Sequence, residues 1–120
     1  MTQTELNRQV LSMLTADSEL AEMVNGVFPI VAEQGTDLPF ITYRTQSSED
    51  TRHKDGVEPT RAVVRIVVAA RFYKSLMEIS ERVREVMEAD SDYTLTGWSE
   101  DYNDEAQQTY LNLMDFSVLL

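Results

Sequence analysis

Few side chains in this sequence could do chemistry, and the only histidine, His53, is the first to consider. His53 lies between Arg52 and Lys54, with Asp50 and Asp55 further out, so carboxylates could join it around a cation. The two adjacent cations oppose metal binding electrostatically, and one histidine cannot make a two-histidine site. We therefore interpret His53 as an exposed loop residue and expect no metal ion.

A second group of ionisable side chains is acidic and consists of Glu100, Asp101, Asp104 and Glu105. Such a cluster could bind Ca²⁺, but an EF-hand loop needs a central glycine and a final glutamate, and neither is present. Paired carboxylates could serve a glycosidase, but these fall in a predicted surface turn. No serine lies in a nucleophile elbow, and no glycine-rich loop could hold phosphate. The sequence therefore predicts a protein that is not an enzyme and needs no cofactor.

Composition restricts the class of protein further. The 120 residues carry 21 acidic and 10 basic side chains, a formal net charge of -11. An acidic surface repels phosphate, so we expect DNA at most to pass by without sticking. The chain has no cysteine, and no apolar run approaches the roughly 20 residues of a membrane span. The first residues lack the basic and apolar segments of a signal peptide, so we expect no membrane association.

The strongest pattern is a strand followed by a helix within residues 60–89. The stretch Arg61–Phe72 is rich in β-branched residues and has no Gly or Pro, which predicts a long strand. Its apolar face comprises Ala62, Val64, Ile66, Val68 and Ala70, and its mixed face comprises Arg61, Val63, Arg65, Val67, Ala69 and Arg71. The apolar face should meet the helices. The mixed face is typical of a solvated sheet surface or of one that meets acidic groups of a partner.

The helix that follows is predicted from Ser75 to about Ala89. Ser75 and Glu78 have the spacing of a capping box. The apolar stripe of this helix comprises Leu76, Ile79, Val83, Val86 and Met87. Two charge pairs at four-residue spacing, Glu78 with Arg82 and Arg84 with Glu88, should lie on its outer side. A strand and a helix that pack their apolar surfaces together should form the core.

The remaining elements complete the fold prediction. A first helix should span Thr4 to Thr15 with Thr4 as its cap, and Asp17 should cap a second that ends at a left-handed Gly26. The further strands are Val27–Val31, Leu38–Thr45, Tyr93–Tyr102, with Trp98 on the face opposite Tyr93, and Gln108–Leu119. This order, α-α-β-β-β-α-β-β, predicts a single α+β domain over residues 1–120. Its mostly antiparallel sheet has four to five strands, with helices packed on one face.

Residues 46–59 form a polar stretch without apolar periodicity, which predicts a long, flexible hairpin loop. Loops of this length in small domains are usually functional or disordered, and this one could become ordered when a neighbouring subunit binds. We therefore place candidate subunit-interface residues in this loop and on the mixed strand face. These candidates are Arg52, His53, Lys54, Arg61, Arg65 and Arg71.

Several stretches, read together, resemble the tail-completion, or tail-terminator, proteins of long-tailed phages and prophages. The likeness covers most of the chain. It rests on Val24–Pro29, Leu38–Tyr43, the strand Arg61–Phe72, the helix Leu76–Glu88, and the turn Asp101–Asp104 leading to Tyr110–Val118. None of these pieces is a catalytic signature, and the family has no active-site residues to carry over.

The resemblance implies an α+β subunit that assembles into a ring, commonly of six, in the virion or in the host-cell cytoplasm during assembly. Such a ring caps the tail tube, joins it to the head connector, and lets DNA pass through its lumen. Ring closure requires a heterologous contact, for which sheet edges and a long loop are ready means. The alternative is an acidic monomeric binding or inhibitor module that acts on a host protein, which the net charge supports.

Overall fold

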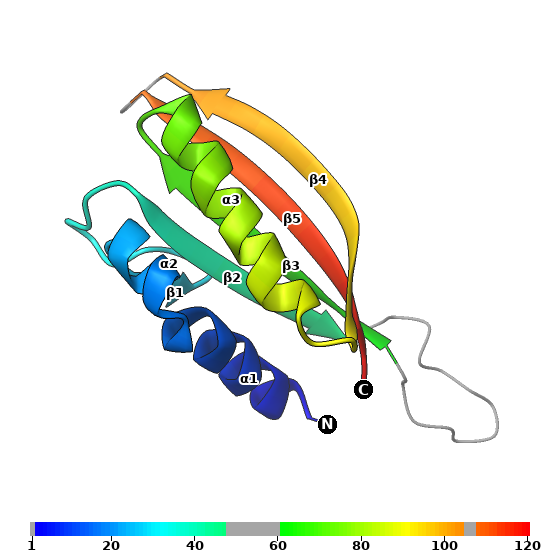
Figure 1. Ribbon diagram of the computed structural model, residues 1–120. Coiled ribbons are helices and arrows are strands. Elements are labelled where there is room, and N and C mark those ends of the chain that lie inside the picture. The colour runs from blue at the N-terminus through cyan, green and yellow to red at the C-terminus, as the bar shows by residue number, and fades with distance from the viewer. Residues whose placement is uncertain (1, 48–60, 105–107) are drawn as a thin grey trace, which may run out of the picture.

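The computed structural model describes residues 2–47, 61–104 and 108–120, which form three helices and a five-stranded sheet (Figure 1). The elements are α1 (Gln3–Ala16), α2 (Ser18–Met23), β1 (Val27–Pro29), β2 (Phe40–Ser47), β3 (Arg61–Ala70), α3 (Tyr73–Glu88), β4 (Tyr93–Asn103) and β5 (Thr109–Leu119). Their order is the one predicted, and the α+β class is confirmed.

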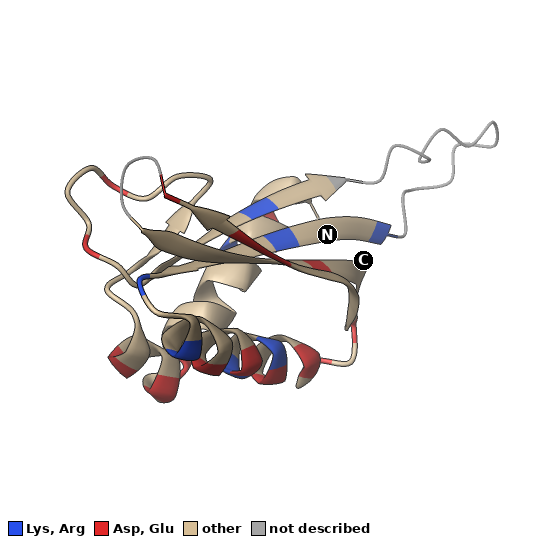
Figure 2. Cartoon of the chain, turned by 90° about the horizontal axis from the view of Figure 1, so that it is seen from above, with Lys and Arg blue, Asp and Glu red and all other residues tan. Residues whose placement is uncertain are grey.

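The sheet has the strand order β1-β2-β3-β5-β4. Strand β1 is parallel to β2, and every other neighbouring pair is antiparallel. Strand β3 is central, because it pairs along its whole length with β5 and along eight residues with β2. All three helices lie on one face of this sheet, and the opposite face has no helix over it (Figures 1 and 2).

The core lies between that sheet face and the helices. It contains the predicted apolar face of β3, the predicted stripe of α3 and one side of α1. The fully buried members include Val64, Ile66, Val68, Leu76, Val83, Met87, Leu6, Val10, Leu14, Met114 and Phe116. Full burial of a side chain of this size stabilises the fold by about 1.5–3 kcal/mol. The long strand β3 and the amphipathic helix α3, packed against each other, thus form the centre of the core.

The predicted start of the first helix is wrong, because Thr2 rather than Thr4 caps α1. The Thr2 hydroxyl accepts a hydrogen bond from the Glu5 N–H at 3.1 Å, and the Glu5 carboxylate accepts one from the Thr2 N–H at 3.2 Å. This reciprocal capping box satisfies two donors at the helix end. The predicted cap of α2 is confirmed, since the Asp17 carboxylate accepts from the Leu20 N–H at 2.9 Å.

The predicted start of α3 is also wrong. The helix begins at Tyr73, and Phe72 occupies the N-cap position without a side-chain capping bond. Ser75 therefore lies inside the first turn, and the expected box with Glu78 does not form. Strand β3 ends at Ala70, two residues earlier than predicted, which makes room for this earlier helix start.

Gly26 serves a different purpose from the one predicted. Among the described residues, positive φ occurs at Ile30 (65°) and Gly35 (89°), and Gly26 is not left-handed. A Cβ at Gly26 would lie 2.4 Å from the ring of Phe28. The glycine therefore allows a close approach of the aromatic ring to the backbone.

Strand β4 departs from the predicted alternation. A β-bulge between Leu95 and Gly97 shifts its register against β5. The bulge adds one residue, so Trp98 faces the same side as Tyr93 and packs against the core. The prediction that Trp98 lies opposite Tyr93 is therefore wrong.

The loop prediction also changes at its first residues. Strand β2 begins at Phe40 and continues through Gln46 and Ser47, so these two residues belong to the sheet. The rest of the predicted loop, residues 48–59, lies outside the described residues, as do residue 60 and residues 105–107 between β4 and β5.

Candidate functional site

One face of the sheet is left uncovered by the helices, and we call it the uncovered face. Alternation along the strands and the register between them place on it Phe40, Thr42, Arg44 and Gln46 of β2, Arg61, Val63, Arg65, Val67 and Ala69 of β3, and Leu111, Leu113, Asp115 and Ser117 of β5. Figure 2 shows the bare side of the sheet opposite the helical layer. Thr42 and Ala69 of this face are buried, but most of it has no helical layer over it among the described residues, which makes it a natural place for a contact with another molecule.

The uncovered face has a charged part across three neighbouring strands. The register places Arg65 of β3 between Arg44 of β2 and Asp115 of β5. The Arg65 guanidinium donates two hydrogen bonds to the Asp115 carboxylate, at 2.9 and 3.1 Å, and these bonds raise the pKa of Arg65. Arg61 donates to the Ser117 hydroxyl at 2.8 Å. Arg44 is exposed and has no ion pair with any residue the structure describes.

The other end of the uncovered face is an apolar depression, which we call the basin. It lies between the sheet and the segment of residues 30–38, and its apolar lining includes Ile30, Val31, Phe40, Val67 and Leu111. The side chains of Ile30 and Val31 are 62% and 72% exposed, which is unusual for aliphatic residues that lie side by side. An exposed apolar surface of this kind indicates a binding site for another apolar group.

Both edges of the sheet carry features that oppose pairing with another strand. On β4 these are the bulge near Gly97 and the Asp101 carboxylate, which accepts a hydrogen bond from the Tyr102 N–H at 2.8 Å. At the other edge β1 is only three residues long, and beyond it the Gln3 side chain donates to the Thr45 carbonyl of β2 at 2.6 Å. Native proteins block edge strands with bulges, charges and covering segments. The structure therefore favours the uncovered face over the edges as the contact surface.

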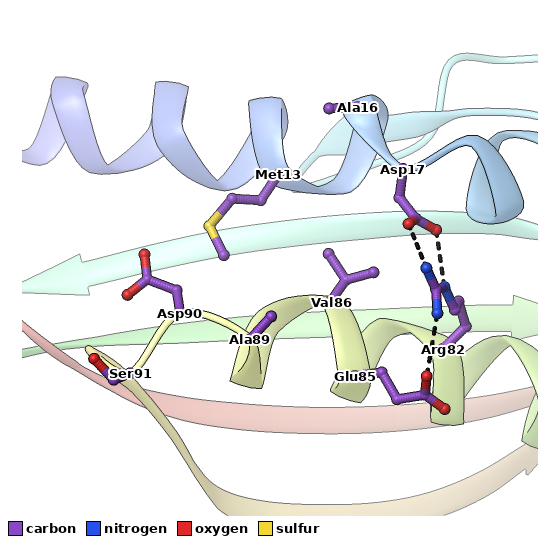
Figure 3. A pocket seen from close by; sticks show the side chains of 9 residues that line it. All are labelled: Met13, Ala16, Asp17, Arg82, Glu85, Val86, Ala89, Asp90 and Ser91. Carbon is purple, nitrogen blue, oxygen red and sulfur yellow. Dashed lines mark hydrogen bonds and ion pairs between the residues drawn. The ribbon is translucent and has the colours of Figure 1, made fainter.

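A shallow groove between α1 and α3 is a second candidate, and Figure 3 shows its lining. Met13 and Val86 contribute apolar surface, and Arg82 lies at one end. The Arg82 guanidinium is within 2.6 Å of Asp17, 2.9 Å of Glu19 and 3.1 Å of Glu85. The three carboxylates share the single Arg82 guanidinium and join the start of α2 to α3, so we interpret these groups as a structural cluster.

The contacts of Arg82 correct one predicted charge pair. Arg82 pairs with Asp17, Glu19 and Glu85, while Glu78 lies 3.9 Å from Lys74. Asp17 and Glu19, at the start of α2, lie closer to Arg82 than the predicted partner Glu78 does. The predicted pair of Arg84 with Glu88 is confirmed at 2.9 Å.

The most strongly shifted tyrosine is buried in the core. Burial, together with the nearby Asp90 and Asp92 carboxylates, raises the pKa of Tyr93 to about 12. Its hydroxyl donates to the Gln9 side chain at 2.6 Å, which joins β4 to α1. Among the described residues no group of three or more His, Asp or Glu side chains is placed to hold a metal ion. No helix in the described part of the chain is long and apolar enough to cross a membrane.

The structure places only some of the predicted interface residues together. Arg61 and Arg65 lie on the uncovered face, whereas Arg71 follows the end of β3 and is exposed beside it. Arg52, His53 and Lys54 lie outside the described residues. Of the predicted acidic cluster, Glu100 accepts a hydrogen bond from the Tyr73 hydroxyl at 2.9 Å, and Glu105 is not described.

Sequence reasoning missed Arg44, Asp115 and the basin as parts of one surface. Alternation along β2 did place Arg44 on one face with Phe40, but nothing in the sequence showed that β2 and β5 flank β3. The pairing of strands distant in sequence is what creates this surface.

The fold and the uncovered face together define an α+β interaction module. The model of the family described as tail completion protein gp17 matches residues 8–120, so the chain belongs to this family of phage structural proteins. The fold is similar to the solved structure of bacteriophage SPP1 gp17, with a TM-score of 0.59 and 14% sequence identity over 94% of this chain and 88% of that chain. No curated protein is significantly similar in sequence. The chain is accordingly a phage tail-completion protein.

Proposed function

We propose that this tail-completion protein is a tail-terminator or head–tail joining subunit that closes into a ring. The ring caps the tail tube and connects it to the head, and six is the expected number of subunits. Membership of the family supports this role. The observation that carries the assembly part of the proposal is the uncovered face, with the unpaired Arg44 and the adjoining basin.

The contact that closes the ring must join two different patches on successive subunits. The uncovered face is the first patch, since both sheet edges are blocked. The uncovered face has a basic excess, with Arg44, Arg61 and Arg65 against Asp115, while the helices carry Lys and Arg together with an excess of Asp and Glu (Figure 2). Opposite charges on the two sides of a subunit favour a contact between the sheet of one copy and the helical side of the next.

The partners of such a ring are the tail-tube and head-connector proteins, and DNA passes through its lumen. The net charge of -11 is consistent with passage, because an acidic protein does not hold phosphate. The protein acts in the virion, and it assembles in the host-cell cytoplasm.

Light scattering after size-exclusion chromatography, over a series of protein concentrations, tests this proposal. We expect the mass to rise from monomer to a closed oligomer, and we expect Arg44→Glu to shift this transition to higher concentration. The matched control is Arg44→Lys, which keeps the positive charge at the same exposed position and should leave the transition unchanged. A protein that stays monomeric and does not add to tails lacking it would support the acidic monomeric inhibitor instead.

A further inference from the structure

Two exposed apolar residues of this protein occupy backbone positions that residues of their type rarely occupy. The first is Ile30, a β-branched residue with φ of 65°, a conformation that such residues rarely adopt. Backbone hydrogen bonds hold it there: the Ile30 N–H donates to the Tyr43 carbonyl at 2.8 Å, and the Val31 N–H donates to the Pro29 carbonyl at 2.6 Å. This tight turn keeps the Ile30 and Val31 side chains exposed beside the basin.

The second feature is Phe72, which occupies the N-cap position of α3. Small polar side chains are preferred there because they bond to free N–H groups of the first turn, and phenylalanine cannot do so. The Phe72 side chain is 64% exposed, so the core does not require it. Residues that break local rules in this way are expected at functional positions.

The two features are complementary in shape and charge. The basin is a depression with Glu33 in its lining. Phe72 is 64% exposed and lies in the sequence between Arg71 and Lys74, both of which are exposed. Neither Glu33 nor Arg71 has an ion pair with any residue in the described part of the chain. An aromatic side chain flanked by cations therefore matches an apolar depression that has a free carboxylate.

The two features also lie on opposite sides of the sheet. The basin is on the uncovered face, and Phe72 begins a helix of the opposite layer. A contact between them joins unlike patches on successive copies, as a heterologous assembly requires. We propose that Phe72 of one copy inserts into the basin of the next, with Arg71 facing Glu33. This inference rests on the proposed ring, and it names the contact that forms it.

Cysteine cross-linking tests the contact directly, because the natural sequence has no cysteine. Val31→Cys and Lys74→Cys, which both keep Phe72, are prepared as separate full-length variants, one of them with an affinity tag, and are mixed and mildly oxidised. If the two variants paired at random, the amount of mixed disulfide would equal the sum of the two homodisulfides. We expect the amount of mixed disulfide to be larger than that sum. The matched control replaces Val31→Cys with Ser12→Cys on exposed α1, for which we expect no such excess.

The outcomes separate this inference from the proposed function. If the unmodified protein forms a closed oligomer but the mixed disulfide shows no excess, the contact is overturned and the ring stands. If Val31→Cys instead links to a tail-tube protein, the basin binds that protein and the contact is likewise overturned. If the unmodified protein never assembles alone or on tails, the ring itself is overturned. The contact would be supported if Glu33→Arg in the Val31→Cys copy removes the excess of mixed disulfide and Arg71→Glu in the other copy restores it.

Discussion

Arg65 and Asp115 lie directly opposite each other in the β3–β5 register, and two hydrogen bonds of 2.9 and 3.1 Å join their side chains. This pair neutralises the middle of the uncovered face. Arg44 of β2 lies directly opposite Arg65 in the β2–β3 register and has no ion pair with any described residue. The face thus offers two arginines, Arg44 and Arg61, without a carboxylate partner among the described residues, which is a simple arrangement for orienting an acidic partner.

This arrangement predicts different results for Arg65 and Arg44. Because the Arg65–Asp115 pair is solvent-exposed, Arg65→Gln should lower the free energy of unfolding by less than about 1 kcal/mol. Arg44→Gln should leave stability unchanged but weaken assembly, since Arg44 has no carboxylate partner in the described structure and is available to an acidic partner. Urea unfolding and light scattering measure the two effects. Equal loss of assembly in both variants would show that the pair opens on binding.

The N-cap of α3 predicts a variant that gains stability while losing assembly. Phe72→Ser supplies the capping oxygen that the helix lacks, and should raise the free energy of unfolding by about 1 kcal/mol. It also removes the side chain proposed to enter the basin, so the oligomer should dissociate. The control is Phe72→Leu, which keeps an apolar side chain and should assemble without the gain in stability. A destabilised Phe72→Ser would mean that Phe72 is a structural residue.

A buried amide in the core predicts a second stabilising change. The side chain of Asn112 is fully buried, and neither its oxygen nor its nitrogen finds a hydrogen-bond partner in the described structure. Removing such a group avoids a desolvation penalty of about 1–3 kcal/mol, and leucine has nearly the same shape. We expect Asn112→Leu to raise the thermal midpoint. Ser80→Ala, at a similarly unpaired buried hydroxyl, should shift it in the same direction.

A lower thermal midpoint for Asn112→Leu would contradict this expectation. It would show that the amide has a partner, such as an internal water molecule, whose hydrogen bonds the variant loses.

The cluster around Arg82 predicts a dependence of stability on pH. The hydrogen bond from Arg82 lowers the pKa of Asp17 below its ordinary value of 3.8, with a further contribution from the Leu20 N–H. A carboxyl whose pKa is lower in the folded state stabilises the fold fully above its unfolded pKa. That contribution is lost as the pH falls through the lower, native value.

Asp17→Asn tests this dependence because asparagine is an equally good N-cap but carries no charge. We expect the variant to unfold at a lower temperature than the natural protein near neutral pH. The difference should shrink as the solution is acidified and vanish once Asp17 is protonated in the folded state. Thermal unfolding across a pH series measures it, and a difference that does not depend on pH would argue against the ion pair with Arg82.

Several features could be predicted from the sequence because their cause is local. Alternation along residues 61–70 was enough to assign the buried face of β3, and the helical spacing of Leu76, Ile79 and Val83 assigned that of α3. Asp17 was recognisable as a cap from its position before an apolar helix. From the single histidine and the absence of cysteine and glycine-rich loops we predicted an assembly role rather than catalysis, and this stays a prediction.

Only the tertiary structure decided which strands, and therefore which side chains from distant parts of the sequence, are neighbours. Arg44, Arg65 and Asp115 form one row because β2 and β5 flank β3, and residues up to 71 positions apart are thereby brought together. The bulge in β4 turned Trp98 toward the core, and β3 ended early enough to place Phe72 at a helix start. Periodicity depends on neighbours along the chain, so it determines the face of each element. Strand order, register and the basin depend on packing between distant segments, which no local pattern records.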